Sequence, residues 1–329
     1  MKNVKRRVDI IGYVGCYADD QTKLLYQFGL DANTGQFKGA KAVAEAADVK
    51  YLSIWDNCLA YPLQAGDKAG VRLVDADTLV LKAEAYYELV AAAYILQDGQ
   101  YIYTGNFHEG SVLIYDDKLN LIKRIETGKD SGVHQLSRHS NYLLVNCMNL
   151  DKIFIYDLTS NFELVKTIDF KPGVGIRHGV FNKQHDLYYL VSEYTNEVFV
   201  FKVDGLQFNL INQWPLLSRR AQNPAAAAIR LSQDETRLFV SIRGADLINV
   251  YEVDKTVLTL IQQVSCGGQH PRDFIFCDDE QYLIVANRLS DELVSFRLGS
   301  DKKIKEKCGV LKIKQPIAII IQKEEKYNE

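Results

Sequence analysis

The sequence lacks several features that would place it in a common functional class. Its 39 basic and 42 acidic side chains are scattered along 329 residues and give a formal net charge of -3. A nucleic-acid-binding protein usually gathers its Lys and Arg residues into a patch or stripe, and no such stripe is present. The apolar stretch Leu89–Leu96 is far shorter than the roughly 20 residues that cross a bilayer. We therefore expect neither nucleic acid nor a membrane as a partner.

The beginning of the sequence also lacks a secretion signal. Met1–Arg7 is basic, but Asp9 and Gly12 interrupt the residues that follow before an apolar run of signal-peptide length. This pattern favours a cytoplasmic protein.

The six cysteines form no motif. None belongs to a C-x-x-C pair, and none has a histidine at the spacing of a metal site. They are Cys16, Cys58, Cys147, Cys266, Cys277 and Cys308. The pattern favours separate reduced thiols that pack as small hydrophobic side chains. We expect no metal site and no obligatory cofactor.

The chain does contain an internal repeat. Each unit has a strand with alternating apolar residues, a short polar interruption and a second strand that ends on an aromatic residue. The five clearest units end on Tyr115, Tyr156, Phe201, Tyr251 and Phe296, at steps of 41, 45, 50 and 45 residues. Periods of about 40 to 50 residues with four strands in each unit are typical of β-propeller blades.

Two weaker copies, ending near Phe28 and Leu73, bring the number of units to seven. Residues 317–321 begin like an inner strand, which the N-terminal copy lacks. A blade assembled from both ends of the chain would close the ring and remove exposed sheet edges. We predict an all-β fold, a seven-bladed β-propeller with four-stranded antiparallel blades, in which residues 1–329 form a single domain.

The repeat also predicts where a functional site lies. Adjacent strands run in opposite directions, so the start of each inner strand shares a face of the disc with the loop between the second and third strands. Polar side chains at these positions come from blades far apart in sequence, as in many small-molecule pockets. They are His134, Arg177, His178, Arg272, Asn106, Glu193, Arg243, Asn287 and Arg288.

Basic groups dominate this set, and a small anionic substrate is the partner that they favour. Arginine offers a fork of donors suited to carboxylate or phosphate. Glu193 or His134 would act as general base or acid, and the sequence leaves this choice open. No G-x-S-x-G motif is present, so an activated water fits better than a covalent serine intermediate.

Each candidate also has a structural interpretation. His134 and His178 could fill a narrowing channel, Arg177 and Arg243 could pair with Glu193 because a partly buried charge needs a partner, and Arg272 could brace neighbouring blades through Asp273. Three other histidines are expected at the surface: His108, His139 and His185.

Several segments are similar to a known family. They are GYVGCY (12–17), VKYL (49–52), VHQ (133–135), GIRHGVF (175–181), SEYTNEVFVF (192–201), SIRGADLINVY (241–251) and GGQHPRDF (267–274). They resemble the bacterial lactonase family, whose members have the seven-bladed propeller fold and include 6-phosphogluconolactonase and the fungal carboxymuconate lactonizing enzyme. The resemblance implies that His134, Arg177, Glu193 and Arg243 occupy the positions proposed as active-site residues in the lactonizing branch.

The chain departs from the family pattern at three positions. Gly132 stands where a second histidine is common, Cys147 where an acidic residue is common, and Ala228 where a glutamate is common. The sequence leaves three functions as alternative hypotheses. The first is hydrolysis of an anionic sugar lactone, with 6-phosphogluconolactone as the implied substrate. The second is a muconate-type cycloisomerase, and the third is a non-catalytic propeller that binds a ligand or partner, which the departures favour. The sequence indicates no oligomeric state.

Overall fold

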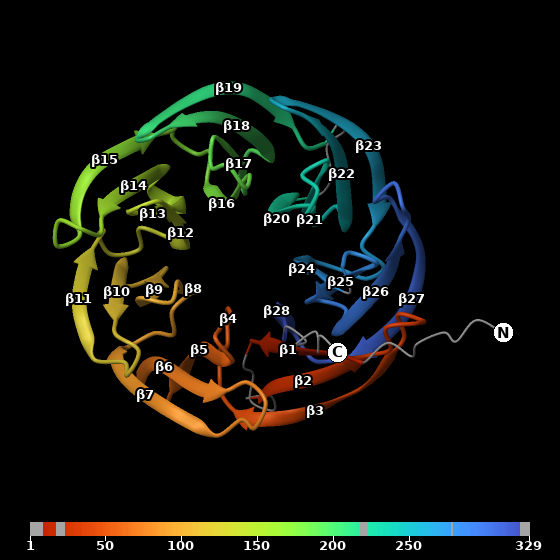
Figure 1. Ribbon diagram of the computed structural model, residues 1–329, viewed down its shortest axis with the longest axis horizontal. Coiled ribbons are helices and arrows are strands. Elements are labelled where there is room, and N and C mark those ends of the chain that lie inside the picture. Colours follow the sequence, from red (N-terminus) through yellow and green to blue (C-terminus); the bar gives the residue numbers. More distant parts are fainter. Residues whose placement is uncertain (1–8, 18–23, 218–222, 278, 323–329) are drawn as a thin grey trace, which may run out of the picture.

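Nearly all of the regular secondary structure in the described part of the chain is β-strand. In this computed structural model it comprises residues 9–17, 24–217, 223–277 and 279–322; the basic segment Met1–Arg7 lies outside these ranges. The strands form seven four-stranded antiparallel sheets that stand around a central axis (Figure 1). The predicted seven-bladed β-propeller is confirmed.

Each blade has an inner, a second, a third and an outer strand. The inner strands are β28 (Pro316–Ile321), β4 (Ser53–Trp55), β8 (Tyr94–Gln97), β12 (Val133–His139), β16 (Ile176–Phe181), β20 (Ala225–Leu231) and β24 (Pro271–Cys277). The second strands are β1 (Ile10–Cys16), β5 (Cys58–Ala65), β9 (Ile102–Asn106), β13 (Tyr142–Cys147), β17 (Leu187–Ser192), β21 (Arg237–Arg243) and β25 (Tyr282–Asn287).

The third strands are β2 (Leu24–Leu30), β6 (Lys68–Asp75), β10 (Ser111–Tyr115), β14 (Lys152–Asp157), β18 (Glu197–Asp204), β22 (Leu247–Asp254) and β26 (Glu292–Leu298). The outer strands are β3 (Phe37–Glu45), β7 (Leu81–Glu88), β11 (Leu121–Glu126), β15 (Glu163–Asp169), β19 (Gln207–Pro215), β23 (Val257–Ser265) and β27 (Ile304–Lys312). A single turn of 3-10 helix, η1 (Met148–Leu150), follows β13. We number the blades 1 to 7 in the order in which the inner strands are given above.

The burial of a strand follows from its place in the blade. Strands β9 and β10 are buried at every residue, because blades on both sides cover them. Fully buried strands are typically short continuous apolar sequences, and β10 (SVLIY) is close to this pattern. The outer strand β11 instead alternates between exposed and more buried residues, as a strand with one solvated face does.

The hydrophobic core is divided into layers between neighbouring blades. Tyr103 and Val112 of blade 3 belong to one buried cluster with Leu143 and Val145 of blade 4. Equivalent clusters join the other blades around the ring. Each blade is therefore held mainly by its two neighbours.

Blade 1 contains both ends of the described chain. Strand β28 pairs antiparallel with β1, with Val14 opposite Ile319 and Gly12 opposite Ile321. The inner strand that the N-terminal copy lacks is therefore supplied by the C-terminal segment, as predicted. This pairing closes the ring (Figure 1).

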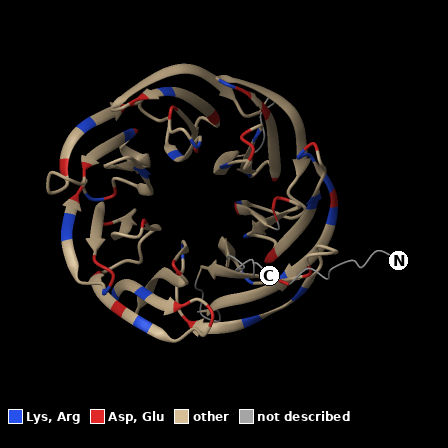
Figure 2. Ribbon diagram, viewed as in Figure 1, with Lys and Arg blue, Asp and Glu red and all other residues tan. Residues whose placement is uncertain are grey.

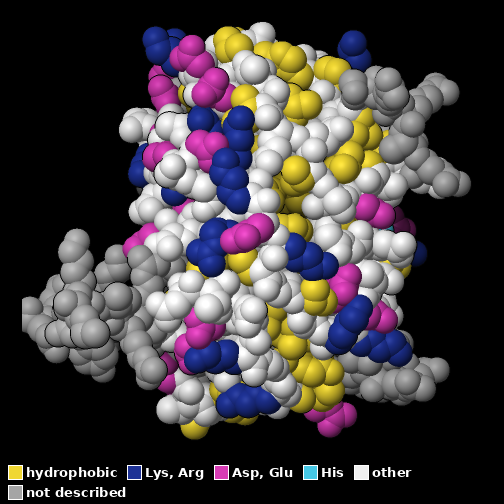
Figure 3. Space-filling model, turned by 90° about the vertical axis from the view of Figure 1, so that its right-hand side faces the viewer, with side chains coloured by type: hydrophobic (Ala, Val, Ile, Leu, Met, Phe, Trp, Pro, Cys, Tyr) yellow, Lys and Arg dark blue, Asp and Glu magenta, His cyan; other side chains and the backbone are white. Residues whose placement is uncertain are grey.

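Charged side chains are spread around the rim of the disc. Lys, Arg, Asp and Glu occur on every side of the ring (Figure 2), and the side view shows basic, acidic and hydrophobic groups intermixed (Figure 3). Within the described ranges, no helix is long and apolar enough to span a bilayer.

The alternating strand directions define two faces of the disc. We call the face where the inner strands begin the mouth face. The loops between second and third strands lie on the same face. We call the opposite face the turn face, because it carries the tight turns between inner and second strands. One example is the turn at Asp98, whose carboxylate accepts hydrogen bonds from the backbone N–H groups of Gln100 and Tyr101.

We expect the closing strand to be essential for stability. A chain that ends at residue 314 loses β28, including the buried side chains of Ile317 and Ile319, and should lose at least about 5 kcal/mol of unfolding free energy from apolar burial and the reopened edge. Urea denaturation followed by circular dichroism measures the loss. A chain that ends at residue 322 keeps all described strands and is the control; equal stability of the two chains would contradict the prediction.

Candidate functional site

A carboxylate shared by two arginines lies on the mouth face. Glu193 directly follows β17, Arg177 is the second residue of β16 and Arg243 ends β21. Glu193 Oε2 lies 3.0 Å from Arg177 Nε and 2.6 Å from Arg243 Nη2. Three residues separated by up to 66 positions thus form one ion-pair network across blades 5 and 6.

The two guanidinium groups are also held by backbone carbonyls. Arg177 donates to Ala227 O, and Arg243 donates to Ala225 O and Ala226 O at 3.2 Å each. Arg177 is only 1% exposed, so its side chain positions Glu193 and has almost no surface on which to contact a ligand. In Arg243, Nη1 has no hydrogen-bond partner among the described residues.

The charges in this network shift one another's pKa values. Burial alone would raise the pKa of Glu193, but the positive charges of Arg177 and Arg243 outweigh it and lower the pKa below the ordinary value. Burial, followed by repulsion from Arg243, lowers the pKa of Arg177 to about 9. Near neutral pH, Glu193 is therefore an ionised carboxylate between two cations.

Two histidines form a pair beside this network. His134 Nδ1 lies 3.0 Å from His178 Nε2, and the two rings meet edge to face. Burial is the main cause that holds the pKa of both groups well below the ordinary value, and the charge of Arg177 adds to the effect. Both imidazoles are therefore neutral at pH 7. Because one ring donates and the other accepts in this hydrogen bond, only the donating ring keeps a free nitrogen lone pair.

A second group of arginines lies nearer the solvent. The guanidinium groups of Arg272 and Arg288 lie 5.1 and 4.6 Å from the centre of the Tyr17 ring, an arrangement suited to cation–π attraction. Arg288 also donates to Gln315 Oε1. Arg272 makes no ion pair or hydrogen bond with its side chain among the described residues, and its neighbour Asp273 pairs with Arg230 instead.

His270 and Tyr17 also belong to this site but were not among the residues expected from the sequence. Burial and the nearby charges of Arg243 and Arg288 lower the pKa of His270 to about 4. His270 directly precedes β24, and Tyr17 directly follows β1. Both therefore occupy positions that the strand-direction argument assigns to the mouth face, and extending that argument to blade 1 would have found Tyr17.

The side-chain amides of Asn106 and Asn287 are buried and hydrogen-bonded within the protein. Both are 0% exposed. Asn106 Nδ2 donates to Glu88 Oε1 and to Val90 O, whereas Asn287 Nδ2 donates to Cys266 O. Their expected role in substrate binding gains no support from this geometry, and we leave both residues out of the proposed site.

Glu88, the partner of Asn106, is a buried carboxyl group. It is 3% exposed, and burial raises its pKa to about 7. The hydrogen bonds from Asn106 and Ser111 offset only part of the cost of burying the charged form.

The structure also bears on two other expectations. Gly132 has a positive φ of 75°, and a Cβ at this position would lie 2.8 Å from Asn149 N, so a histidine cannot replace it without moving the backbone.

His139 was expected at the surface, but it is 7% exposed and stacks on Phe181, so this expectation is wrong. The ring fits there because Nε2 bonds to Gly205 O. All six cysteines are free.

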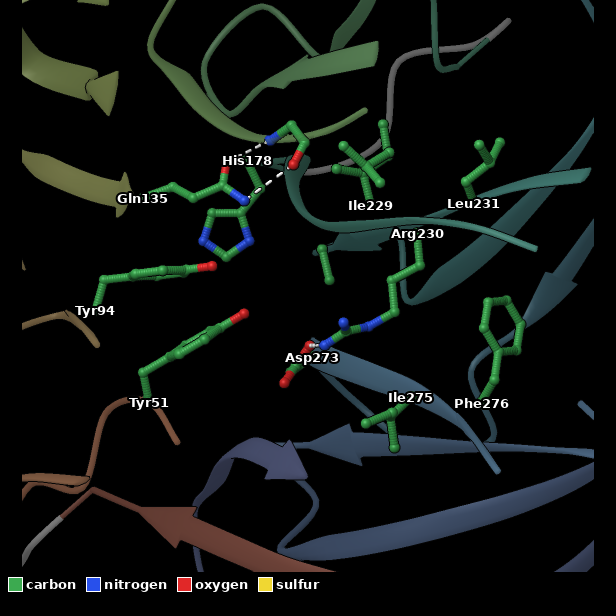
Figure 4. A pocket seen from close by; sticks show the side chains of 13 residues that line it. Tyr51, Tyr94, Gln135, His178, Ile229, Arg230, Leu231, Asp273, Ile275 and Phe276 are labelled. Carbon is green, nitrogen blue, oxygen red and sulfur yellow. Dashed lines mark hydrogen bonds and ion pairs between the residues drawn. The ribbon is translucent and has the colours of Figure 1, made fainter. Parts of the chain in front are cut away.

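A cavity of about 360 Å³ lies in the channel beyond the histidine pair. Its lining includes His178 but none of Arg177, Glu193 or Arg243. In β20, those arginines bond to residues 225–227, whereas residues 228–231 line the cavity. Because inner strands run from the mouth face to the turn face, the cavity lies on the turn-face side of the charged network. Figure 4 shows the side chains that line the cavity.

Among the described residues, no group of three or more His, Cys, Asp and Glu side chains is arranged to hold a metal ion.

The chain matches a family model described as lactonase, 7-bladed β-propeller, over residues 11–321. It therefore belongs to this family of lactone-hydrolysing enzymes. The 6-phosphogluconolactonase of Bacillus subtilis is 26% identical over 317 residues, which cover 87% of this chain and 90% of the relative. An uncharacterized protein of Staphylococcus saprophyticus is 26% identical over 307 residues, with 85% and 89% coverage.

Solved structures show the same fold. A protein from Lactobacillus plantarum aligns with a TM-score of 0.88 at 22% identity. The alignment covers 96% of this chain and 100% of that protein's chain. The periplasmic gluconolactonase of Pseudomonas aeruginosa has a TM-score of 0.86 at 21% identity, with 95% and 99% coverage. At such identities the likeness shows the fold alone.

Replacing the shared carboxylate should destabilise the protein. In Glu193→Gln the buried guanidinium groups of Arg177 and Arg243 face each other without a counter-charge, which should cost about 3 kcal/mol or more. Urea denaturation at pH 7 measures the change. The control Glu306→Gln removes a surface ion pair with Arg297 and should cost less than about 1 kcal/mol. Equal losses in the two variants would show that the network contributes little.

Glu88 should make stability depend on pH. Its folded pKa of about 7 exceeds the ordinary 4.5, so its contribution is present below 4.5 and is lost as the pH rises through 7. Glu88→Gln lacks this loss, and its stability relative to the parent protein should increase by up to about 3 kcal/mol between pH 5 and pH 8.5.

Denaturation curves at the two pH values measure the effect of Glu88→Gln. The exposed residue Glu163 provides the control variant Glu163→Gln, which should show no such increase. A difference between Glu88→Gln and the parent protein that is the same at both pH values would refute the assignment of a raised pKa.

Proposed function

We propose that the protein hydrolyses an anionic sugar lactone at the mouth face, with 6-phosphogluconolactone as the substrate. The observation that carries the proposal is a cluster of four arginines among the described residues of this face, Arg177, Arg243, Arg272 and Arg288, all close enough to lower the pKa of His270. Arg177 and Arg243 share one carboxylate, and Arg272 has no acidic partner among the described residues. A partly buried cation without a counter-charge favours an anion as ligand. The relative from Bacillus subtilis supports the choice of a phosphorylated lactone.

Arg272 and Arg288 bind the phosphate in this proposal. Both are partly buried. Their contacts with the Tyr17 ring already restrict the two side chains, so less side-chain freedom is lost when a phosphate binds. Guanidinium forks match the oxygen atoms of a phosphate group. The reacting end of the lactone then lies toward Arg243 and the histidine pair.

His134 acts as the general base. As a neutral imidazole it can take a proton from water while the water oxygen attacks the lactone carbonyl carbon. In this proposal His134 Nδ1–H donates to His178 Nε2 at 3.0 Å, which fixes the ring and leaves the Nε2 lone pair of His134 free to accept the proton. Glu193 is the weaker candidate, because its Oε2 is already paired with the guanidinium groups of both Arg177 and Arg243.

Arg243 stabilises the developing oxyanion. Its Nη1, which has no hydrogen-bond partner within the described ranges, donates to the carbonyl oxygen as negative charge accumulates there. When the tetrahedral intermediate collapses, the bond between the carbonyl carbon and the ring oxygen breaks, and the ring oxygen takes the proton back from His134. The product is the open-chain hydroxy acid.

Two variants test these roles in a hydrolysis assay with 6-phosphogluconolactone, corrected for the spontaneous rate. His134→Asn should lower kcat about 100-fold or more, because the general base is lost. Arg272→Met should raise KM about tenfold or more for the phosphorylated lactone and much less for unphosphorylated gluconolactone, which lacks the group that Arg272 binds.

Tyr194→Phe is the control, since Tyr194 is an exposed residue of the mouth face and should keep the parent kinetics. Absence of any acceleration above the spontaneous rate in the parent protein would reject the proposed hydrolysis. Loss of diene absorbance from a carboxymuconate under the same conditions would favour the cycloisomerase instead.

A further inference from the structure

The channel cavity beyond His178 has the composition of a second ligand site. Its polar groups come from six blades: Tyr51, Tyr94, Gln135, His178, Arg230 and Asp273. A volume of about 360 Å³ lies at the lower end of the range for small-molecule pockets. The cavity is separate from the arginine network, so the anion proposed for the mouth face does not account for it.

Two tyrosines place hydroxyl groups in the cavity. The rings of Tyr51 and Tyr94 stack with their centres 4.0 Å apart, and both rings also meet the edge of His178. Figure 4 shows the two hydroxyls directed into the space in front of Arg230. Burial raises the pKa of both tyrosines, so they remain neutral hydroxyls that can donate and accept hydrogen bonds.

The opposite wall carries Arg230, whose guanidinium group uses only some of its hydrogen-bond donors. Arg230 donates through Nε to Phe274 O and through Nη2 to Asp273 Oδ1, the latter at 3.0 Å. Its Nη1 has no hydrogen-bond partner among the described residues. Asp273 is itself fixed, because Oδ1 accepts from Phe274 N and Oδ2 accepts from Ile319 N. The donor Nη1 is thus held by groups that leave it free for a ligand.

The charge of the cavity differs from that of the mouth face. Arg230 is matched by Asp273 within the lining itself, and the tyrosines and His178 are uncharged near pH 7. A phosphate or dicarboxylate would find no excess positive charge here. The several donors and acceptors on a partly apolar wall instead match a molecule that carries many hydroxyl groups and no charge.

We propose that this half of the channel binds a neutral polyhydroxylated molecule, of the size of a monosaccharide or a cyclic polyol. Ring hydroxyls would accept from Arg230 Nη1 and exchange hydrogen bonds with Tyr51 and Tyr94. The carbon skeleton would pack on Ala228 and Ile275, which also line the cavity. The site would act independently of the lactone at the mouth face.

Isothermal titration calorimetry with D-glucose, D-galactose and myo-inositol tests the proposal. At least one of these probes should bind saturably. Tyr51→Phe and Tyr94→Phe each remove one hydroxyl and keep the stacked rings, and each should weaken that binding about fivefold. Tyr194→Phe, which removes an exposed hydroxyl outside the cavity, is the matched control and should leave the affinity unchanged.

A competition experiment separates the two sites. Excess 6-phosphogluconate, an anion expected at the mouth face, should not displace the neutral probe. Displacement of the probe, equal binding in the parent protein and both cavity variants, or no saturable binding of any probe would each overturn the proposal. None of these outcomes bears on lactone hydrolysis, which is measured separately in the parent protein.

Discussion

The carboxylate of Glu193, shared by Arg177 and Arg243, determines the chemistry of the mouth face. Two guanidinium groups this deeply buried would repel each other without it, because charges attract and repel more strongly where water is excluded. The same carboxylate lies at the junction of blades 5 and 6, so the charge balance of the site and the packing of the ring depend on one group. The arginines in turn keep Glu193 ionised and paired, and in the proposed reaction the proton acceptor is the neutral His134.

The histidine pair divides the channel into two chemically different halves. On one side Arg177 and Arg243 share the single carboxylate of Glu193, and on the other Arg230 and Asp273 balance each other. His178 contributes to both, since it bonds to His134 and lines the cavity. A propeller can therefore present two unlike ligand environments along one axis, because each inner strand contributes side chains at successive depths.

The sequence predicts the ring and the location of the charged site, because both follow from position within the repeat. His134 and Arg177 lie at the starts of inner strands, Glu193 and Arg243 lie at the ends of second strands, and the antiparallel arrangement brings both kinds of position to one face. Position in the repeat does not predict where a side chain points. Asn106 and Asn287 occupy the expected face, yet their amides bond to neighbouring loops. The burial of Arg177 depends on a carbonyl of the next blade, and the stacking of Tyr51 on Tyr94 joins two blades, so neither leaves a local signal in the sequence.

The pairing of β28 with β1 has a consequence for the order of folding. On the ribosome, the first strands emerge with their inner edge unpaired, and their partner is among the last described segments to be made. A growing chain thus exposes an open sheet edge until β28 has been made, and an open edge favours association with other chains. A chain that stalls or ends before β28 would remain an open arc.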